Sequence, residues 1–402
     1  MLKSLIETHD GATHLDKQRQ LIESAISEDR DLSDALEYEG WSYDDLIYER
    51  SNALSWRGRM TPKLDELLHP GKGIPFVSFF TGCGGMDLGL EAAGFQHVAA
   101  FEINELFCNT LRHNRPIWKV FGPPIHSGDV SNIDDTSSAL STVIKTPFEG
   151  LFVGGPPCQP FSIAANQRFA RWGDNFKRTG FLHATNGNLL FDFIELVITF
   201  RPKAFVIENV PGLRDLDGGE QLASAIGKMK SAGYEVHEPF VLDASNHGVP
   251  QQRLRLFVVG SRDGGSLKLP KAQESIGAGS VLSKRIAKRT KNSETRQHKA
   301  ESILRYMKLD YGSRDQLGRV DRLNPALPSK TVIAGGTNGG GRSHLHPEIP
   351  RTLSVRECAR LQTFPDEYEF IGATARQFTQ VGNAVPPVLA ATLGHMITEG
   401  LF

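Results

Sequence analysis

The stretch IPFVSFFTGCGGMDLGLEAAG, residues 74–94, joins a short apolar run to a helical pattern through a glycine-rich turn. The run at 74–80 predicts a buried strand, and the pattern at 86–94 predicts a helix. Glycines in the turn FTGCGG, residues 80–85, let a ligand approach the backbone where a helix presents free N–H groups. The turn lacks the complete G-x-G-x-x-G fingerprint, so by itself it is only a weak indication of a cofactor site.

The same alternation of strand and helix continues to about residue 260. Further strands are expected at residues 97–102, 151–155, 203–208, 235–243 and 255–260. Helices are expected between them at residues 105–114, 188–200 and 220–233, and near the C-terminus at 354–364 and 386–401. This order predicts an α/β fold with a doubly wound, mostly parallel sheet, which binds ligands at the carboxyl ends of its strands.

The overall charge of -1 conceals two segments of opposite sign. Residues 263–345 hold 16 Lys and Arg against 7 Asp and Glu, whereas residues 1–75 hold 9 against 15. The basic segment is either a DNA-contact surface or a solvated face. No apolar stretch approaches the length of a membrane span and the N-terminus is too polar for a signal peptide, so we expect a cytoplasmic protein without a membrane partner.

Acidic residues are expected at two further strand ends. Glu102 follows the strand at 97–102, and Asp129, in the sequence GDV, is expected to end a third strand. Together with the glycine-rich turn, these carboxylates indicate a nucleoside-cofactor site, with Glu102 on ribose hydroxyls and Asp129 on an adenine amino group. The alternative is a set of unrelated helix N-caps.

Cys158 lies in GGPPCQPFS, residues 154–162, directly after the strand at 151–155. Pro156 and Pro157 restrict the backbone before the cysteine, which favours a nucleophile presented at a fixed angle over a buried, inert thiol. The four cysteines contain no Cys-x-x-Cys pair, so neither a metal site nor a disulfide framework is expected.

Two more elements carry charged groups to strand ends. Glu208 ends the apolar run at 203–208, where an acid is costly to bury without a partner. Arg253 and Arg255 alternate with Gln251 in QQRLR, so the two arginines are expected on one face, either at a substrate or in a surface salt bridge.

In their order along the chain, these motifs resemble those of the DNA (cytosine-5) methyltransferases of the prokaryotic restriction-modification type. The resemblance rests on FTGCGGMDLGLEAAGF, FEIN, GDV, GGPPCQPFS, ENV, QxRxR, RTLSVRECARLQTFP and QVGNAVPP. It implies a Rossmann-like, S-adenosylmethionine-dependent methyltransferase fold with a smaller target-recognition domain. Four parts are expected: an N-terminal helical extension of unknown role (1–72), a catalytic and cofactor-binding domain (73–261), a target-recognition region (262–345) and a segment returning to the catalytic domain (346–402).

The resemblance also implies roles for individual residues. Cys158 would add to C6 of a flipped-out cytosine, Glu208 would hold the base, and Arg253 and Arg255 would contact it and orient the acid. The residues implied for S-adenosylmethionine are Phe80, Gly82, Gly84, Glu102, Asp129, Pro157 and Asn383. The residues implied for DNA are Gln159, Ser162, Arg168, Gln251, Lys284, Arg285, Lys288 and Arg289.

The resemblance implies double-stranded DNA as the partner. The protein is expected to be a monomer associated with the nucleoid, and a cognate restriction endonuclease that acts independently is possible. A tRNA-modifying methyltransferase is the main rival, but that branch carries a Cys-Phe-Thr element and this chain has no cysteine between 158 and 358. A catalytically dead binding module would have lost the cysteine, the acid or the glycines. A nicotinamide-dependent dehydrogenase would have no use for PPCQPFS or ENV. The N-terminal extension is expected to pack on the catalytic domain, mediate dimer contacts or bind separate DNA.

Overall fold

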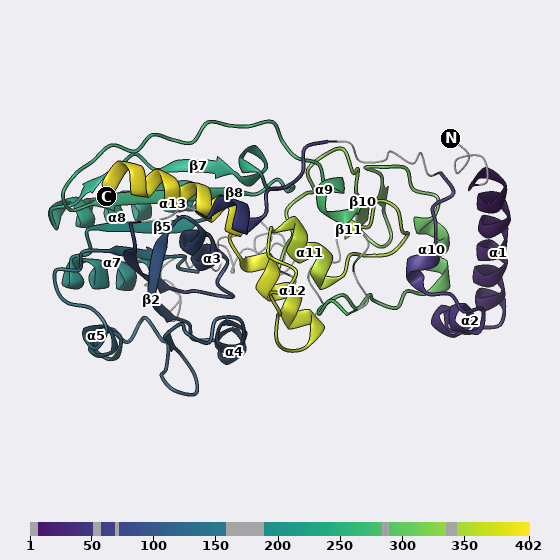
Figure 1. Ribbon diagram of the computed structural model, residues 1–402, viewed down its shortest axis with the longest axis horizontal. Helices are drawn as coiled ribbons and strands as arrows, with labels where there is room; N and C mark the ends of the chain where they lie inside the picture. Colours follow the sequence, from purple (N-terminus) through teal and green to yellow (C-terminus); the bar gives the residue numbers. More distant parts are fainter. Residues whose placement is uncertain are drawn as a thin grey trace.

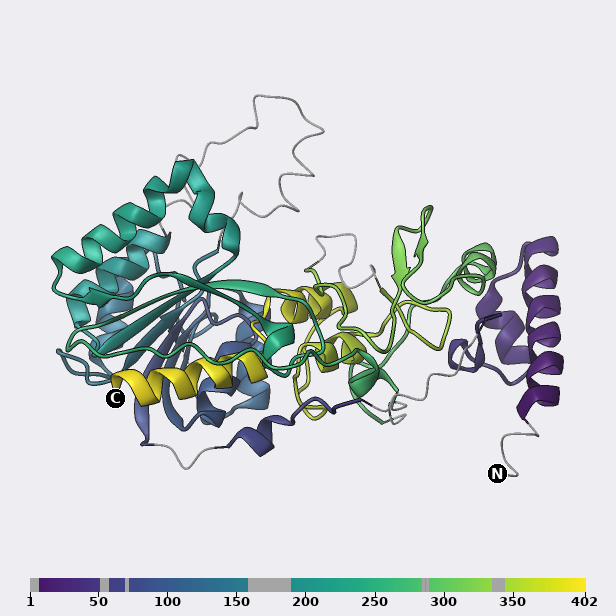
Figure 2. The ribbon, with the colours of Figure 1, turned by 90° about the horizontal axis from the view of Figure 1, so that it is seen from above.

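The computed structural model describes residues 7–50, 58–68, 72–157, 189–283, 286, 289–334 and 344–402. A larger lobe holds the sheet and both of its helical layers, and a smaller lobe ends in the N-terminal helices (Figures 1 and 2). No helix within these ranges is long and apolar enough to cross a membrane.

Eight strands of the described chain form one twisted sheet in the order β3-β2-β1-β4-β5-β8-β6, with β7 also paired to β8. The strands are β1 (Ile74–Phe79), β2 (Phe95–Phe101), β3 (Val120–Phe121), β4 (Leu151–Gly154), β5 (Ala204–Asn209), β6 (Glu235–Val236), β7 (Phe240–Asp243) and β8 (Leu254–Ser261). β1 to β5 pair in parallel, whereas β6, β7 and β8 pair antiparallel. The expected mostly parallel sheet is confirmed.

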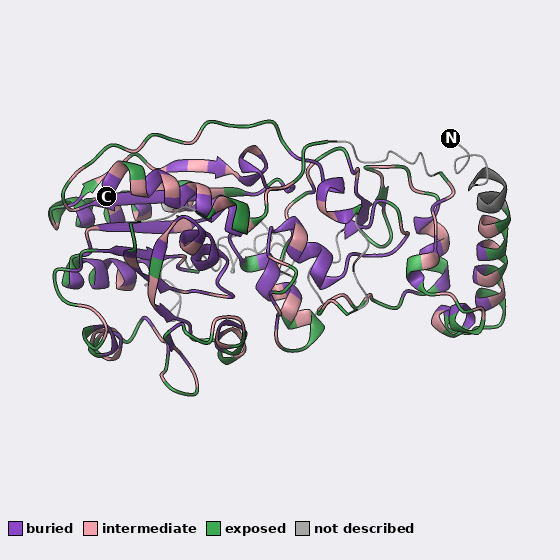
Figure 3. Ribbon diagram, in the orientation of Figure 1, coloured by how far each residue is buried: buried purple, intermediate pink, exposed green. Residues whose placement is uncertain are grey.

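Alternation along β1 builds the two layers of the larger lobe. Ile74 and Phe76 enter a cluster with α3 (Gly85–Ala92) and α13 (Pro387–Leu401). Val77 and Phe79 enter the opposite cluster, because successive side chains of a strand point to opposite faces. That second face is covered by α5 (Ile133–Ser141), α7 (Leu189–Phe200) and α8 (Glu220–Ser231). The central strands are accordingly buried (Figure 3).

The C-terminal helix completes the larger lobe. α13 packs along α3, and a Cβ built on Gly89 would lie 2.3 Å from the carbonyl oxygen of Pro387. The close approach of the two helices therefore depends on the missing side chain at this position. Turns of 3-10 helix and one further helix complete this lobe: η2 (Leu64–Leu67), α4 (Glu105–Asn114), η5 (Pro211–Gly219) and η6 (Ala244–His247).

The smaller lobe contains a three-stranded sheet in the order β11-β10-β9. Its elements are α9 (Gly279–Leu282), α10 (Ala300–Tyr306), β9 (Arg314–Asp315), β10 (Val320–Arg322) and β11 (His344–Leu345). Between the lobes lie α11 (Val355–Leu361) and α12 (Thr374–Asn383). The N-terminal elements α1 (Glu7–Ser27), α2 (Leu32–Tyr38) and η1 (Tyr43–Asp45) pack against α10, at the end of the molecule far from the large sheet (Figure 2).

Most expected elements appear within a few residues of their predicted bounds, and three expectations were wrong. GDV does not end a strand, because β3 stops at Phe121, seven residues before Gly128. The strand expected at 235–243 is split into β6 and β7. Of the N-terminal extension, which was expected to be helical, residues 39–50 contain only a single 3-10 turn at Tyr43–Asp45. The helices α5 and α12 were not predicted.

Candidate active site

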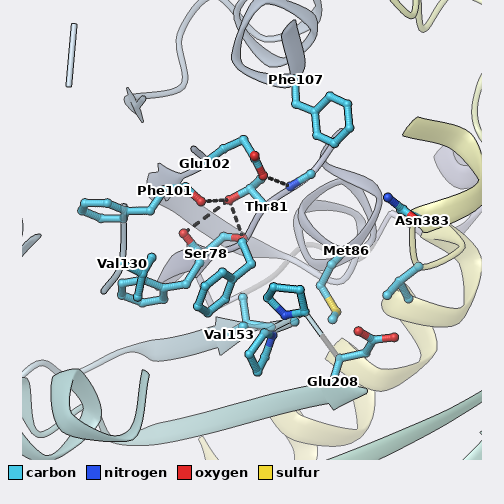
Figure 4. Close-up of a pocket in the computed structure, with 18 of the residues that line it drawn as sticks. Ser78, Thr81, Met86, Phe101, Glu102, Phe107, Val130, Val153, Glu208 and Asn383 are labelled. Atoms are coloured by element: carbon cyan, nitrogen blue, oxygen red, sulfur yellow. Dashed lines mark hydrogen bonds between the residues drawn. The ribbon is translucent and has the colours of Figure 1, made fainter. Parts of the chain in front are cut away.

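A cavity of about 880 Å³ opens at the carboxyl ends of β1, β2, β4 and β5. Eight of the predicted cofactor and catalytic residues line it: Phe80, Gly82, Glu102, Asp129, Pro157, Glu208, Arg255 and Asn383. In Figure 4 Glu102 lies beside Thr81 at one end, and Glu208 lies toward the other end with Met86 and Asn383. The parallel sheet thus brings together residues that are up to about 300 positions apart in sequence.

The turn after β1 has a backbone that ordinary residues rarely adopt. Phe80 has φ 56°, a left-handed conformation that costs energy for a residue with a side chain. Gly84 has φ 79° and is the N-cap of α3, and a Cβ there would lie 2.9 Å from Leu111 Cδ2. Gly84 therefore does not line the cavity as expected but permits the turn that forms its wall.

Glu102 fastens this turn to the end of β2. Its Oε2 accepts a hydrogen bond from Gly82 N at 2.7 Å, and its Oε1 accepts one from Asn104 N at 2.8 Å. Burial raises the pKa of Glu102, and the backbone hydrogen bonds oppose that rise. A carboxylate has about four lone-pair positions, so one remains on each oxygen for a hydroxyl group in the cavity. The chemistry of this site fits a ribose.

Two further carboxylates lie at the same end of the cavity. Asp129 Oδ1 accepts hydrogen bonds from the backbone N and the hydroxyl group of Ser131. Asp192, on α7, was missed by the sequence analysis because it lies within an apolar helix rather than at a strand end. Burial, with Glu195 and Asp129 nearby, raises the pKa of Asp192 to about 6.

An ion pair occupies the part of the cavity at the end of β5. Arg255 Nε lies 2.7 Å from Glu208 Oε1, and both side chains are largely buried. Burial lowers the pKa of Arg255, while Glu208 opposes this shift. The next residue, Asn209, donates from Nδ2 to the carbonyl oxygen of Pro156 at 3.2 Å, which fixes the backbone leading to Cys158.

Arg253 and Gln251 lie elsewhere than the alternation predicts. Arg253 is 1% exposed, does not line the cavity, and donates to the carbonyl oxygens of Val332 and Gly382 at 3.2 and 2.8 Å. Its pKa is lowered by burial and by the charge of Arg255. Gln251 is fully buried and bonds Val332 N, the Leu361 carbonyl oxygen and Gln362, so it joins the lobes rather than facing DNA.

The described cysteines are all buried. Burial raises the pKa of Cys108 to about 12 and raises the pKa values of Cys83 and Cys358 as well. These three thiols are therefore protonated at neutral pH, including Cys83, which lies in the wall of the cavity. Cys158 itself lies outside the described residues.

The predicted DNA contacts are tested least by the structure. Arg289 is exposed on the smaller lobe. The remaining candidates other than Gln251 lie outside the described residues: Gln159, Ser162, Arg168, Lys284, Arg285 and Lys288.

A mostly parallel sheet with this cavity at its strand ends defines a Rossmann-like α/β fold with its ligand site at the expected edge. Residues 74–399 match the C-5 cytosine-specific DNA methylase family. The chain belongs to this family and is a DNA (cytosine-5) methyltransferase.

Individual relatives agree with this membership. The chain is 32% identical to the type II methyltransferase M.PspPI of Psychrobacter, over 89% of this chain and 94% of the relative. It is 30% identical to M.Sau96I of Staphylococcus aureus, over 90% and 86%. Its fold matches a prophage-encoded DNA modification methyltransferase from Escherichia coli with a TM-score of 0.65 and 24% identity, over 81% of this chain and 99% of that one.

Proposed function

We propose that this enzyme transfers a methyl group from S-adenosylmethionine to C5 of a flipped-out cytosine in double-stranded DNA, through a covalent adduct with Cys158. We further propose that it is the methyltransferase of a type II restriction-modification system, as its relatives are named. The observation that carries the proposal is the single cavity that joins Glu102 and Asp129 to the Glu208–Arg255 pair.

The cofactor end would be formed by the turn after β1 and by the two acids. Phe80 offers a ring, Glu102 its remaining lone pairs to the ribose hydroxyls, and Asp129 an acceptor for the adenine amino group. When bound, S-adenosylmethionine supplies an electrophilic methyl group on a sulfonium. Pro157 and Asn383 line the same cavity and would complete the contacts.

The base would enter at the Glu208 end. Cytosine in a duplex is stacked and its C5 is a poor nucleophile, so the base must be extruded and its aromaticity interrupted. The Cys158 thiolate would add to C6, which makes C5 nucleophilic toward the methyl group. Loss of the C5 proton to a base would then restore the C5–C6 double bond as the sulfur leaves from C6.

Arg255 would offset the negative charge that this addition places on the ring, and a proton passed from the Glu208 carboxyl group to N3 would neutralise it. The ion pair holds Glu208 Oε1, which leaves the other oxygen to accept from the exocyclic amine of the base and, once protonated, to donate to N3. Cys158 is also the one cysteine left after the three described thiols are excluded by burial. Since Asn209 fixes the Pro156 carbonyl, the approach to Cys158 is held from the same strand as Glu208.

The test is transfer of labelled methyl groups from S-adenosylmethionine to unmethylated plasmid DNA and to bulk tRNA. We expect label in DNA that is lost in Cys158→Ser, while cofactor binding measured by calorimetry persists. Bisulfite sequencing of the product then gives the target site. Duplexes carrying 5-fluorocytosine at that site should trap a denaturation-resistant complex, because fluorine cannot leave as the proton does. Label only in tRNA, or retained by Cys158→Ser, would refute the proposal.

A further inference from the structure

The N-terminal module, residues 13–50, shares one hydrophobic core with the smaller lobe. The lobe contributes only short elements to this core, among them α10, β10 and β11. Such short elements expose apolar faces that they cannot bury against one another. The core consists of Ile22, Ala25, Leu32, Ala35, Leu36, Tyr43 and Leu46 from the module, and Ala300, Ile303, Tyr306, Met307, Val320 and Leu345 from the lobe.

Buried polar contacts fix the module in one position. The Tyr43 hydroxyl donates to the His298 carbonyl oxygen at 2.7 Å and accepts from His298 N at 2.9 Å. The Tyr48 hydroxyl donates to the His346 carbonyl oxygen at 2.8 Å. Because these bonds are directional and buried, a displaced module would leave their partners unsatisfied.

Arg322 joins three segments of chain at this junction. It is 1% exposed, and its guanidinium carbon lies 3.4 Å from the ring centre of Tyr48 and 4.1 Å from that of Tyr311. Its Nη1 donates to the carbonyl oxygens of Arg50 and Leu309, at 3.0 and 2.6 Å. Its Nε donates to the Pro347 carbonyl oxygen at 2.9 Å. Although it belongs to the basic segment of the sequence, Arg322 is not accessible to a phosphate.

The net negative charge of the module disfavours direct contact with the DNA backbone. Residues 13–50 hold eleven acidic and four basic side chains. Each of the four basic side chains pairs with a carboxylate: Lys17 with Glu39, Arg19 with Glu49, Arg30 with Glu28, and Arg50 with Asp310. An effect of the module on DNA is therefore transmitted through the lobe that it supports.

We propose that the N-terminal module is a positioning element for target recognition, and that Tyr48 and Arg322 are its positioning residues. The module completes the core on which the lobe's chain segments are mounted, so it sets where the lobe places its DNA contacts relative to the cavity. This inference rests on the proposed function. It makes target discrimination a property of three chain segments far apart in sequence, around residues 43–50, 298–322 and 344–347.

The test compares three variants. Tyr48→Ala removes the ring on Arg322 and the hydroxyl bond, Tyr48→Phe keeps the ring, and Tyr38→Ala removes a tyrosine of the same module that is 86% exposed. For Tyr48→Ala we expect a rise in KM for plasmid DNA of about tenfold, methylation at additional sequences in bisulfite reads, and unchanged S-adenosylmethionine binding by calorimetry. Tyr48→Phe should recover most of the KM and the discrimination, and Tyr38→Ala should equal the wild type.

Wild-type KM and wild-type site choice in Tyr48→Ala would overturn the inference, as would a parallel loss of cofactor affinity. If Tyr48→Phe raises KM and relaxes discrimination as much as Tyr48→Ala does, the role assigned to the Tyr48 ring is refuted. Should Tyr48→Ala not fold by circular dichroism, Arg322→Lys serves instead, since it keeps the charge but cannot span three carbonyl groups. Absence of methylation by the wild type would instead refute the proposed function, so the two failures are distinguishable.

Discussion

Replacing Glu357 by glutamine should destabilise the junction between the two lobes. The side chains of Glu357 and Arg351 are each 4% exposed, and both guanidinium Nη atoms lie 2.9 Å from a carboxylate oxygen. Glu357 also accepts from Ser354 N at 2.7 Å in the capping box of α11. Arg351 reaches in addition to Asp44 of the N-terminal module, at 2.6 Å. One buried pair thus holds α11 and the module together.

The expected magnitude follows from what Arg351 loses. Removing one partner of a buried pair costs about 3–5 kcal/mol, because the other charge stays buried without compensation. Arg351 retains Asp44, which is 57% exposed, and the Thr352 carbonyl oxygen. We therefore expect a loss in the free energy of unfolding near the lower limit, about 3 kcal/mol at pH 7.

The effect should depend on pH with a definite sign. Burial by itself would raise the pKa of Glu357, but Arg351 outweighs it and the pKa is lowered to about 2. The stabilisation is therefore complete above the unfolded pKa of about 4.3 and is lost as the pH falls toward 2. The difference between Glu357→Gln and the wild type should shrink over the same interval.

Urea unfolding followed by circular dichroism measures this loss. Asp310→Asn is the control, since its ion pair with Arg50 also ties the N-terminal module to a neighbouring segment but has side chains 58% and 76% exposed; it should cost less than about 1 kcal/mol. Replacing both buried partners by apolar residues should recover much of the loss. A cost for Glu357→Gln no larger than that of the control would refute the reasoning.

Three other predictions concern packing, pH and DNA. Gly89→Ala would place a Cβ 2.3 Å from the Pro387 carbonyl oxygen, so it should lower stability in urea by about 1–3 kcal/mol; Gly227→Ala, with open space in α8, should not, and equal effects would contradict the packing. Asp192 has its pKa raised to about 6, so its ionisation costs stability as the pH rises from about 4 to 6. Asp192→Asn should accordingly raise the cofactor-free melting temperature at pH 8 more than at pH 5, and an equal rise at both would contradict this. Neutralising the basic run Lys284, Arg285, Lys288 and Arg289 should weaken DNA binding. It should also lower the slope of log binding constant against log salt concentration by up to about 4; an unchanged slope would mean that the run is a solvated face.

Much of the larger lobe could be predicted because the sequence signals for its strands and strand-end acids are local. Glu102 and Glu208 each follow an apolar run directly, so a strand and its functional end are visible in one short stretch. Asp129 was assigned because GDV was expected to end a strand; no strand ends there, yet Asp129 lines the cavity from the loop after β3. Asp192 could not be predicted, because an acid in an apolar helix gives the same sequence pattern whether its side chain faces solvent or a cavity.

The sequence by itself determined the order of strands and helices, the ligand-binding edge of the sheet and the family motifs, because periodicity and strand-end residues are encoded within a few neighbouring positions. Only the tertiary structure decided which arginines are available. Arg255 lies in the cavity, whereas the guanidinium groups of Arg253 and Arg322 donate hydrogen bonds to backbone carbonyl oxygens of distant segments. It also decided that the N-terminus belongs to the smaller lobe, through contacts such as that of Tyr43 with His298, 255 residues away. Burial between segments so far apart leaves no trace in local pattern.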